Sequence, residues 1–142
     1  MKKLSIILLA CLISSFVGAQ SIFGKWKTID PVTGNDESII EVYKKDGKAY
    51  AKVIAIINEA DRDKTCINCK GKNKNKPILG LDILDGLKEN GDEWSGGKIL
   101  DPKNGKYYKC YIKLTEENTL KLRGYIGISL LGRTEYWYRF KG

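Results

Sequence analysis

The chain has 142 residues, a net charge of +8 and no histidine; 42% of its residues are hydrophobic and 30% are charged. This length suits a single domain with a core of its own. The lack of histidine removes the usual general base, the usual partner of a nucleophile and the commonest metal ligand. We therefore expect a protein that is not an enzyme and that needs no metal or cofactor.

The first residues have the pattern of a secretory signal peptide. Lys2 and Lys3 precede an apolar run over 4–17, which ends in small residues at Ala19. We expect cleavage after Ala19, which leaves residues 20–142 as a single domain outside the cytoplasm, secreted or periplasmic. An alternative is lipoprotein processing at Cys11, although the residues before it fit that signal poorly.

Export has consequences for the partners of the chain. Cleavage removes two lysines and no acid, so the net charge falls from +8 to +6. A basic exported protein meets anionic envelope surfaces or acidic ligands rather than nucleic acid.

The rest of the chain alternates apolar and polar residues with a period of two, which is typical of half-buried strands. Asp46-Gly47 predicts a tight hairpin turn, and Gly96-Gly97 predicts a bulge. The strands are expected at 22–29, 37–45, 48–57, 78–84, 93–100, 106–115, 119–128 and 133–140.

The alternation also predicts which side chains face the core. Ile40 and Val42 share one face of the second strand. The other core-facing residues are expected to be Ala51, Val53, Ala55 and Ile57 in the third strand, and Tyr108, Cys110, Ile112 and Leu114 in the sixth. Eight such strands without an amphipathic helix predict an all-β fold, an antiparallel up-and-down barrel of about eight strands or slightly more. A β-sandwich is the alternative.

Three cysteines remain after the leader, and they lie in different settings. Cys66 and Cys69 belong to the lysine-rich irregular segment 58–77, where we expect a structural disulfide. A redox pair is the alternative, although no helix follows to lower the pKa of a thiol. Three cysteines without histidine make a poor zinc site. Cys110 lies on the apolar face of its strand, which predicts a buried, inert thiol.

The first and last strands carry the residues that we expect to close the barrel. Gly24 allows a close approach, and the guanidinium of Arg139 can stack on the ring of Trp26. These strands meet only if the sheet closes on itself. Gly-x-Trp followed by a late arginine resembles the structural signature of lipocalins and their calycin relatives. The alternative is that Trp26 and Arg139 are ordinary sheet residues that never meet.

Longer runs resemble the bacterial domain-of-unknown-function 2147 family over essentially the whole mature chain. The runs 97–102 and 123–133 are its most specific parts. The matching motifs are Gly24-Lys25-Trp26, 30–34, Cys66-Ile67-Asn68-Cys69, Gly80-Leu81, 94–102, 123–127 and Gly132-Arg133. The resemblance implies a secreted or periplasmic lipocalin-like barrel; it supplies a fold and a compartment but no reaction.

The last strand and the loop before it carry the candidate binding residues. If Arg139 points inward, so do Arg133 and Trp137, and an inward Arg133 needs Glu135 or an anionic ligand as its partner. If the other face of this strand points inward, Tyr136, Tyr138 and Phe140 line the interior. The candidate ligand-binding residues are therefore Arg133, Trp137, Tyr125, Tyr136 and Tyr138.

Two functions follow from these features. The first is an exported lipocalin-like protein that binds a small, mostly apolar ligand, with an anionic group as an option, and catalyses nothing. The second is a structural or protein-interaction module of the envelope, with a filled barrel and the segment 123–133 as its contact surface. The lysines at 70, 72, 74 and 76 are read as a solvated surface or as a weak attraction to anionic lipids or polysaccharide. The oligomeric state stays open.

Overall fold

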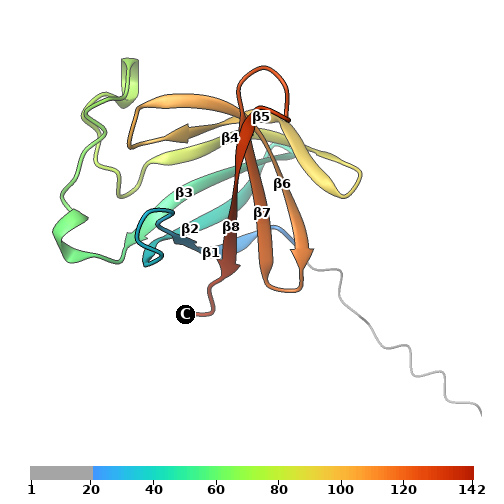
Figure 1. Ribbon diagram of the computed structural model, residues 1–142, viewed down its shortest axis with the longest axis horizontal. Coiled ribbons are helices and arrows are strands. Elements are labelled where there is room, and N and C mark those ends of the chain that lie inside the picture. The colour runs from blue at the N-terminus through green and yellow to red at the C-terminus, as the bar shows by residue number, and fades with distance from the viewer. Residues whose placement is uncertain (1–20) are drawn as a thin grey trace, which may run out of the picture.

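The computed structural model describes residues 21–142, so the predicted signal peptide, residues 1–19, lies outside the described part. Eight antiparallel strands follow one another around a closed barrel (Figure 1). The strands are β1 (Gly24–Ile29), β2 (Asp36–Lys45), β3 (Lys48–Ile56), β4 (Asp82–Asn90), β5 (Glu93–Asp101), β6 (Lys106–Glu116), β7 (Thr119–Tyr125) and β8 (Gly132–Arg139). The predicted up-and-down barrel is confirmed, and the β-sandwich is excluded.

The fourth strand differs most from its prediction. We expected it at 78–84, but β4 begins at Asp82 and runs to Asn90. Residues 78–81 belong to the preceding loop, where Gly80 has a φ of +91°. Gly86, at a φ of +71°, interrupts the alternation inside β4 and conceals its second half in the sequence. Only Gly91 and Asp92 remain as the turn to β5.

A β-bulge decides which end of β3 faces the core. The pairing of β2 with β3 shifts between Ile39 and Ile40. Beyond this bulge Ile56 is buried, whereas Ile57 is 39% exposed. The expectation that Ala55 and Ile57 face the core is therefore wrong, because the extra residue reverses the alternation. Ala51 and Val53, before the bulge, are buried as predicted, as are Ile40 and Val42.

The loop between β3 and β4 is the longest irregular segment. It contains two short 3-10 helices, η1 (Glu59–Asp61) and η2 (Gly71–Asn73), and the isolated bridge between Thr65 and Pro77. Within residues 21–142, no helix is long and apolar enough to cross a membrane.

The barrel closes where β1 pairs with β8. Trp26 lies opposite Arg139, and the guanidinium carbon is 4.0 Å from the centroid of the indole ring. Arg139 also donates through Nη1 to the carbonyl of Phe23 (2.9 Å) and through Nη2 to that of Ser21 (2.6 Å). Gly24 has a φ of +123°, and a Cβ there would lie 3.1 Å from Nη1. The three residues expected to close the barrel thus meet in one contact.

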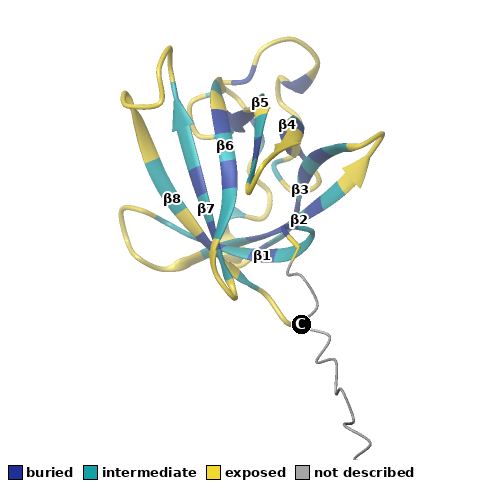
Figure 2. Cartoon of the chain, turned by 90° about the vertical axis from the view of Figure 1, so that its right-hand side faces the viewer, coloured by how far each residue is buried: buried dark blue, intermediate teal, exposed yellow. Residues whose placement is uncertain are grey.

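The two ends of the barrel differ. The closed end carries both ends of the described chain and the short turns at 46–47, 91–92 and 117–118, and its interior is filled by apolar side chains. The fully buried large residues of the core include Trp26, Leu84, Leu87, Ile112 and Leu120. We call the opposite end the mouth; its loops are 30–35, 57–81, 102–105 and 126–131. Figure 2 shows buried segments along the strands and exposed residues along the loops.

The buried thiol of Cys110 gives a first testable prediction. Burial raises its pKa to about 12, because the apolar interior disfavours the thiolate. We expect the native protein not to react with a water-soluble aromatic disulfide reagent at neutral pH, and Cys110 to react once denaturant is added. Absorbance of the released thiolate measures this. A rapid reaction without denaturant would contradict the closed barrel wall around β6.

Candidate ligand-binding site

The register of β8 decides which of its side chains face the interior. Trp137 lies opposite Leu120, and Glu135 lies opposite Leu122. Both leucines are buried, and Trp137 itself is only 2% exposed. By the alternation of a strand, Arg133 and Arg139 share this inward face.

Three of the candidate residues lie elsewhere. Tyr136 and Tyr138 are 46% and 43% exposed on the outer face of β8. Tyr125 follows Gly124, which lies opposite inward Arg133, so Tyr125 also belongs to the outer face. The register therefore shows that Tyr125, Tyr136 and Tyr138 do not line the barrel interior. Of the candidate residues, it brings Arg133 and Trp137 together on the inward face.

Charged side chains from several strands and turns meet at the mouth. Arg133 Nη2 lies 2.8 Å from Glu135 Oε1 and 4.0 Å from Asp101 Oδ2. Lys103 Nζ lies 2.8 Å from Glu37 Oε1 and 4.0 Å from Asp30 Oδ2. We call these six residues the mouth cluster: Asp30, Glu37, Asp101, Lys103, Arg133 and Glu135. Its four carboxylates outnumber its two cations, so the mouth is net negative when all six are ionised.

The wall below the mouth cluster is also polar on one side. Thr28 is 6% exposed, and its hydroxyl lies 2.7 Å from that of Ser38 on the neighbouring strand. The interior therefore changes from apolar at the closed end to polar and charged at the mouth. Such a gradient suits a ligand with an apolar body and a polar head.

Glu135 is the carboxylate of the cluster with a raised pKa. The main cause is burial, which removes water from the carboxylate; the charges of Glu37 and Asp101 add to it, and those of Arg133 and Lys103 oppose it. Its ionised form is thus less favourable in the folded than in the unfolded chain.

This shift predicts a pH dependence of stability. A carboxyl group with a raised pKa in the folded state costs no stability while it is protonated. The cost appears as the pH rises above the unfolded value, 4.5 for this group, and is complete above the folded pKa. We expect Glu135→Gln to gain stability relative to the wild type as the pH increases from about 4 to about 8. Urea unfolding at several pH values measures this difference.

Exposed Glu117, on the turn at the closed end, provides the matched control. Glu117→Gln is expected to follow the wild type at every pH. A difference between Glu135→Gln and the wild type that stays constant with pH would refute the raised pKa.

The indole of Trp137 has an unusual environment. Its Nε1–H has no hydrogen-bond partner among residues 21–142, although the side chain is almost fully buried. Trp26 Nε1, in contrast, donates to the carbonyl of Ile22 at 2.8 Å. A buried donor without a partner costs about 1–3 kcal/mol. Trp137 is one inward position beyond Glu135 on β8 and lies opposite Leu120, so this free donor lies where the polar mouth meets the filled closed end.

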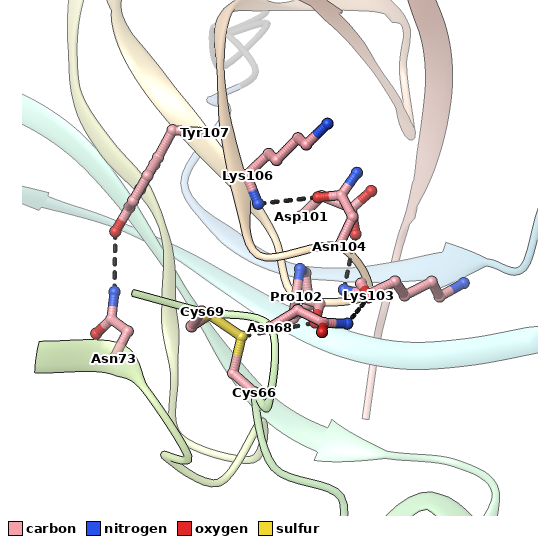
Figure 3. The surroundings of a disulfide bond; sticks show 10 residues. All are labelled: Cys66, Asn68, Cys69, Asn73, Asp101, Pro102, Lys103, Asn104, Lys106 and Tyr107. Atoms are coloured by element: carbon pink, nitrogen blue, oxygen red, sulfur yellow. Dashed lines mark hydrogen bonds between the residues drawn. A yellow bond between two sulfur atoms is a disulfide. The ribbon is translucent and has the colours of Figure 1, made fainter. Parts of the chain in front are cut away.

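The mouth loop 57–81 contains Cys66 and Cys69, and we call it the disulfide loop. It packs against the turn that carries Lys103 (Figure 3). Cys66 and Cys69 are joined as predicted. Asn68 Nδ2 donates to the carbonyl of Lys103 (2.9 Å), and Asn73 Nδ2 donates to the hydroxyl of Tyr107 (2.9 Å). The disulfide therefore holds one mouth loop in place beside the mouth cluster.

Two surface pockets, of about 370 and 400 Å³, flank the disulfide loop and share Asn73 and Tyr107 among their lining residues. Tyr107 is 43% exposed and lies on the outer face of β6. Both pockets therefore adjoin the outer face of β6.

Sequence reasoning predicts Arg133, Glu135 and Trp137 at the site but misses Asp30, Glu37, Asp101 and Lys103. A signal was present: Asp30-Pro31 and Asp101-Pro102 both place a carboxylate at the end of a strand, where it enters a mouth turn. The up-and-down order of the strands places these two turns at the same end, but only the three-dimensional structure shows that their carboxylates approach Lys103 and Arg133.

Comparisons with known proteins agree with this fold. The model of a family described as "uncharacterized protein conserved in bacteria (DUF2147)" matches residues 24–139. Among solved structures, the chain is similar to protein HP1028 from Helicobacter pylori, which is described as belonging to the lipocalin family. The TM-score is 0.74 and the identity 21%, and the match covers 85% of this chain and 84% of that chain. At this identity the similarity establishes the fold alone. No curated protein matches the chain.

Proposed function

The chain belongs to the bacterial protein family DUF2147, and on this premise we propose that it is an exported, lipocalin-like binding protein. Its ligand is a small, mostly apolar molecule held in the mouth of the barrel, and no reaction is catalysed. The closed end of the interior is filled by buried side chains, so the ligand occupies the half of the barrel beneath the mouth cluster.

The observation that carries this proposal is the free indole N–H of Trp137. A buried donor that no group of the described chain satisfies is suited to an acceptor supplied by a ligand. Because Trp137 lies among buried leucines and below a charged mouth, the acceptor belongs to a molecule that is apolar at one end and polar at the other.

The charges at the mouth refine the ligand. The charged contacts at the mouth are uneven: four carboxylates face two cations, and both cations are already paired. An uncharged or cationic head therefore fits better than an anionic one, which would have to displace Glu135 from Arg133. Because the guanidinium of Arg133 is exposed, the binding of an anionic ligand is measured as well.

Export is the second part of the proposal. It rests on the signal-peptide pattern of residues 1–19 and on the disulfide between Cys66 and Cys69, which persists in an oxidising compartment. Cell fractionation of a tagged chain, with mass determination of the mature N-terminus, tests both export and cleavage after Ala19.

Ligand binding is tested with three probes that share one apolar chain: dodecanoic acid, its methyl ester and dodecylamine. Native mass spectrometry and tryptophan fluorescence give their affinities. We expect the ester or the amine to bind more tightly than the acid, and Trp137→Phe to weaken binding about fivefold, the value of one hydrogen bond. The phenylalanine keeps an aromatic ring but cannot donate.

Trp94→Phe is the matched control, because Trp94 is also buried but its Nε1–H is not a buried donor without a partner. It loses the same volume and is expected to leave the affinities unchanged. If no probe and no molecule from a native extract binds, the binding function is wrong, and the alternative of an envelope interaction module with a filled barrel takes its place.

A further inference from the structure

The loop between β7 and β8 exposes a group of large apolar side chains. We call Ile126, Ile128, Leu130 and Leu131 the apolar tip; they are 66%, 58%, 83% and 68% exposed. The loop projects beyond the strands at the mouth (Figure 1). Apolar residues grouped in this way on a soluble surface mark a site of contact with another apolar phase. Their exposure shows that they do not cap the core.

Arg123 holds this loop in shape. Its Nε donates to the carbonyl of Ser129 (2.9 Å), its Nη2 to that of Leu130 (3.3 Å) and its Nη1 to the hydroxyl of Thr134 (2.9 Å). One guanidinium thus satisfies the backbone of the turn and keeps Leu130 and Leu131 outward. A clamped loop loses less conformational entropy on docking than a free one.

Two other mouth loops carry an exposed apolar residue as well. Val32, in the loop between β1 and β2, is 90% exposed, and Ile67, inside the disulfide loop, is 64% exposed. Because the strands are antiparallel and connected in order, these loops and the apolar tip lie at the same end of the barrel. Exposed apolar residues therefore lie on three of the loops at the mouth.

Positively charged residues lie close in sequence to one of these exposed apolar residues. Lys70, Lys72, Lys74 and Lys76 follow Ile67 directly, all four are exposed, and none forms an ion pair within the described part of the chain. No acidic residue interrupts the segment from 64 to 81. Free lysines beside exposed apolar side chains complement an anionic, amphipathic surface such as a bilayer with acidic headgroups.

We propose that the mouth of the barrel docks on an anionic lipid bilayer, with the apolar tip inserted between the headgroups and the lysines of the disulfide loop against the phosphates. This goes beyond the proposed binding function and depends only on its export, which brings the chain to the envelope.

Vesicle co-sedimentation tests the docking. The purified protein is mixed with vesicles of phosphatidylcholine alone and with vesicles of equal parts phosphatidylcholine and phosphatidylglycerol. We expect clear binding to the anionic vesicles, which salt weakens, and little binding to the neutral ones. The double variant Leu130→Asp/Leu131→Asp is expected to lose at least about tenfold in vesicle affinity, because the carboxylates cannot enter the headgroup region.

Three further variants separate the contributions. Tyr136→Asp/Tyr138→Asp places the same charge on the outer wall of the barrel and is expected to have a much smaller effect. Lys72→Gln/Lys74→Gln/Lys76→Gln is expected to reduce the preference for anionic over neutral lipid. Leu130→Trp is expected to be quenched by brominated lipids, a direct sign of insertion, since the three natural tryptophans are buried.

Each other outcome overturns the docking. It is wrong if the anionic vesicles do not bind the protein, or if Leu130→Asp/Leu131→Asp binds them as the wild type does. A wild-type dimer in gel filtration that this double variant converts to a monomer would assign the tip to a second copy instead. The two proposals are distinguishable: Trp137→Phe should dock normally, and Leu130→Asp/Leu131→Asp should bind dodecyl probes normally in the absence of vesicles.

Discussion

Trp26→Ala is expected to lower the free energy of unfolding by about 3–5 kcal/mol, the range for truncating a fully buried aromatic side chain. Trp26 has no exposed surface, and its Nε1 donates to Ile22, which ties the segment before β1 to the core. Its ring is also the surface on which Arg139 lies. The substitution therefore removes the filling of the closed end and the contact that joins the first strand to the last. Urea unfolding, followed by circular dichroism, measures the loss.

A double-mutant cycle with Arg139→Ala isolates the closing contact. At 4.0 Å from the ring centroid, the guanidinium should couple to Trp26 by about 1–2 kcal/mol, so that Arg139→Ala costs less once Trp26 is gone. Lys121 and Tyr111 form a longer contact of the same kind, 5.7 Å, and provide the control pair with coupling close to zero. Additive effects of Trp26→Ala and Arg139→Ala would show that the two side chains close the barrel independently.

Gly105→Ala is expected to cost about 2–4 kcal/mol, since it combines backbone strain with steric overlap. Gly105 has a φ of +72°, and a Cβ there would overlap the carbonyl of Asn68 in the disulfide loop. The alanine must push this loop away from the β5–β6 turn and break the hydrogen bond from Asn68 to Lys103. We expect faster tryptic cleavage at the lysines of the loop, together with a lower melting temperature.

Gly34 provides the matched control for this variant. Its φ of +75° is nearly the same, but no atom lies within 4 Å of a Cβ built there. Gly34→Ala should therefore lower the free energy of unfolding only by the backbone strain, about 1–2 kcal/mol. It should leave the proteolysis of the disulfide loop unchanged. Equal effects of the two alanines would mean that the disulfide loop does not depend on its contact with Gly105.

The features that sequence reasoning predicted well are those encoded over a few neighbouring residues. Asp46-Gly47 forms its hairpin with both residues at positive φ, and Gly96 marks the irregularity in β5. The closing contact was also predictable, although its residues are far apart, because an up-and-down barrel has only one way to pair its first and last strands.

Other features failed for identifiable reasons. β4 was displaced because Gly86 breaks its alternation, and Ile57 was placed in the core because a bulge adds one residue to β3. A single inserted residue moves every later side chain of the strand to the opposite face of the sheet, and no local sequence pattern predicts the insertion.

The sequence by itself thus determined the class of fold, the order of the strands, the closing residues and the disulfide, since period, turn chemistry and proximity along the chain suffice for these. Only the tertiary structure decided that Trp137 faces inward with an unpaired N–H, that four carboxylates and two cations share the mouth, and that the apolar tip is exposed. These properties arise from strand register and from loops that meet only when the barrel has closed, so their partners are distant in sequence and invisible to any local pattern.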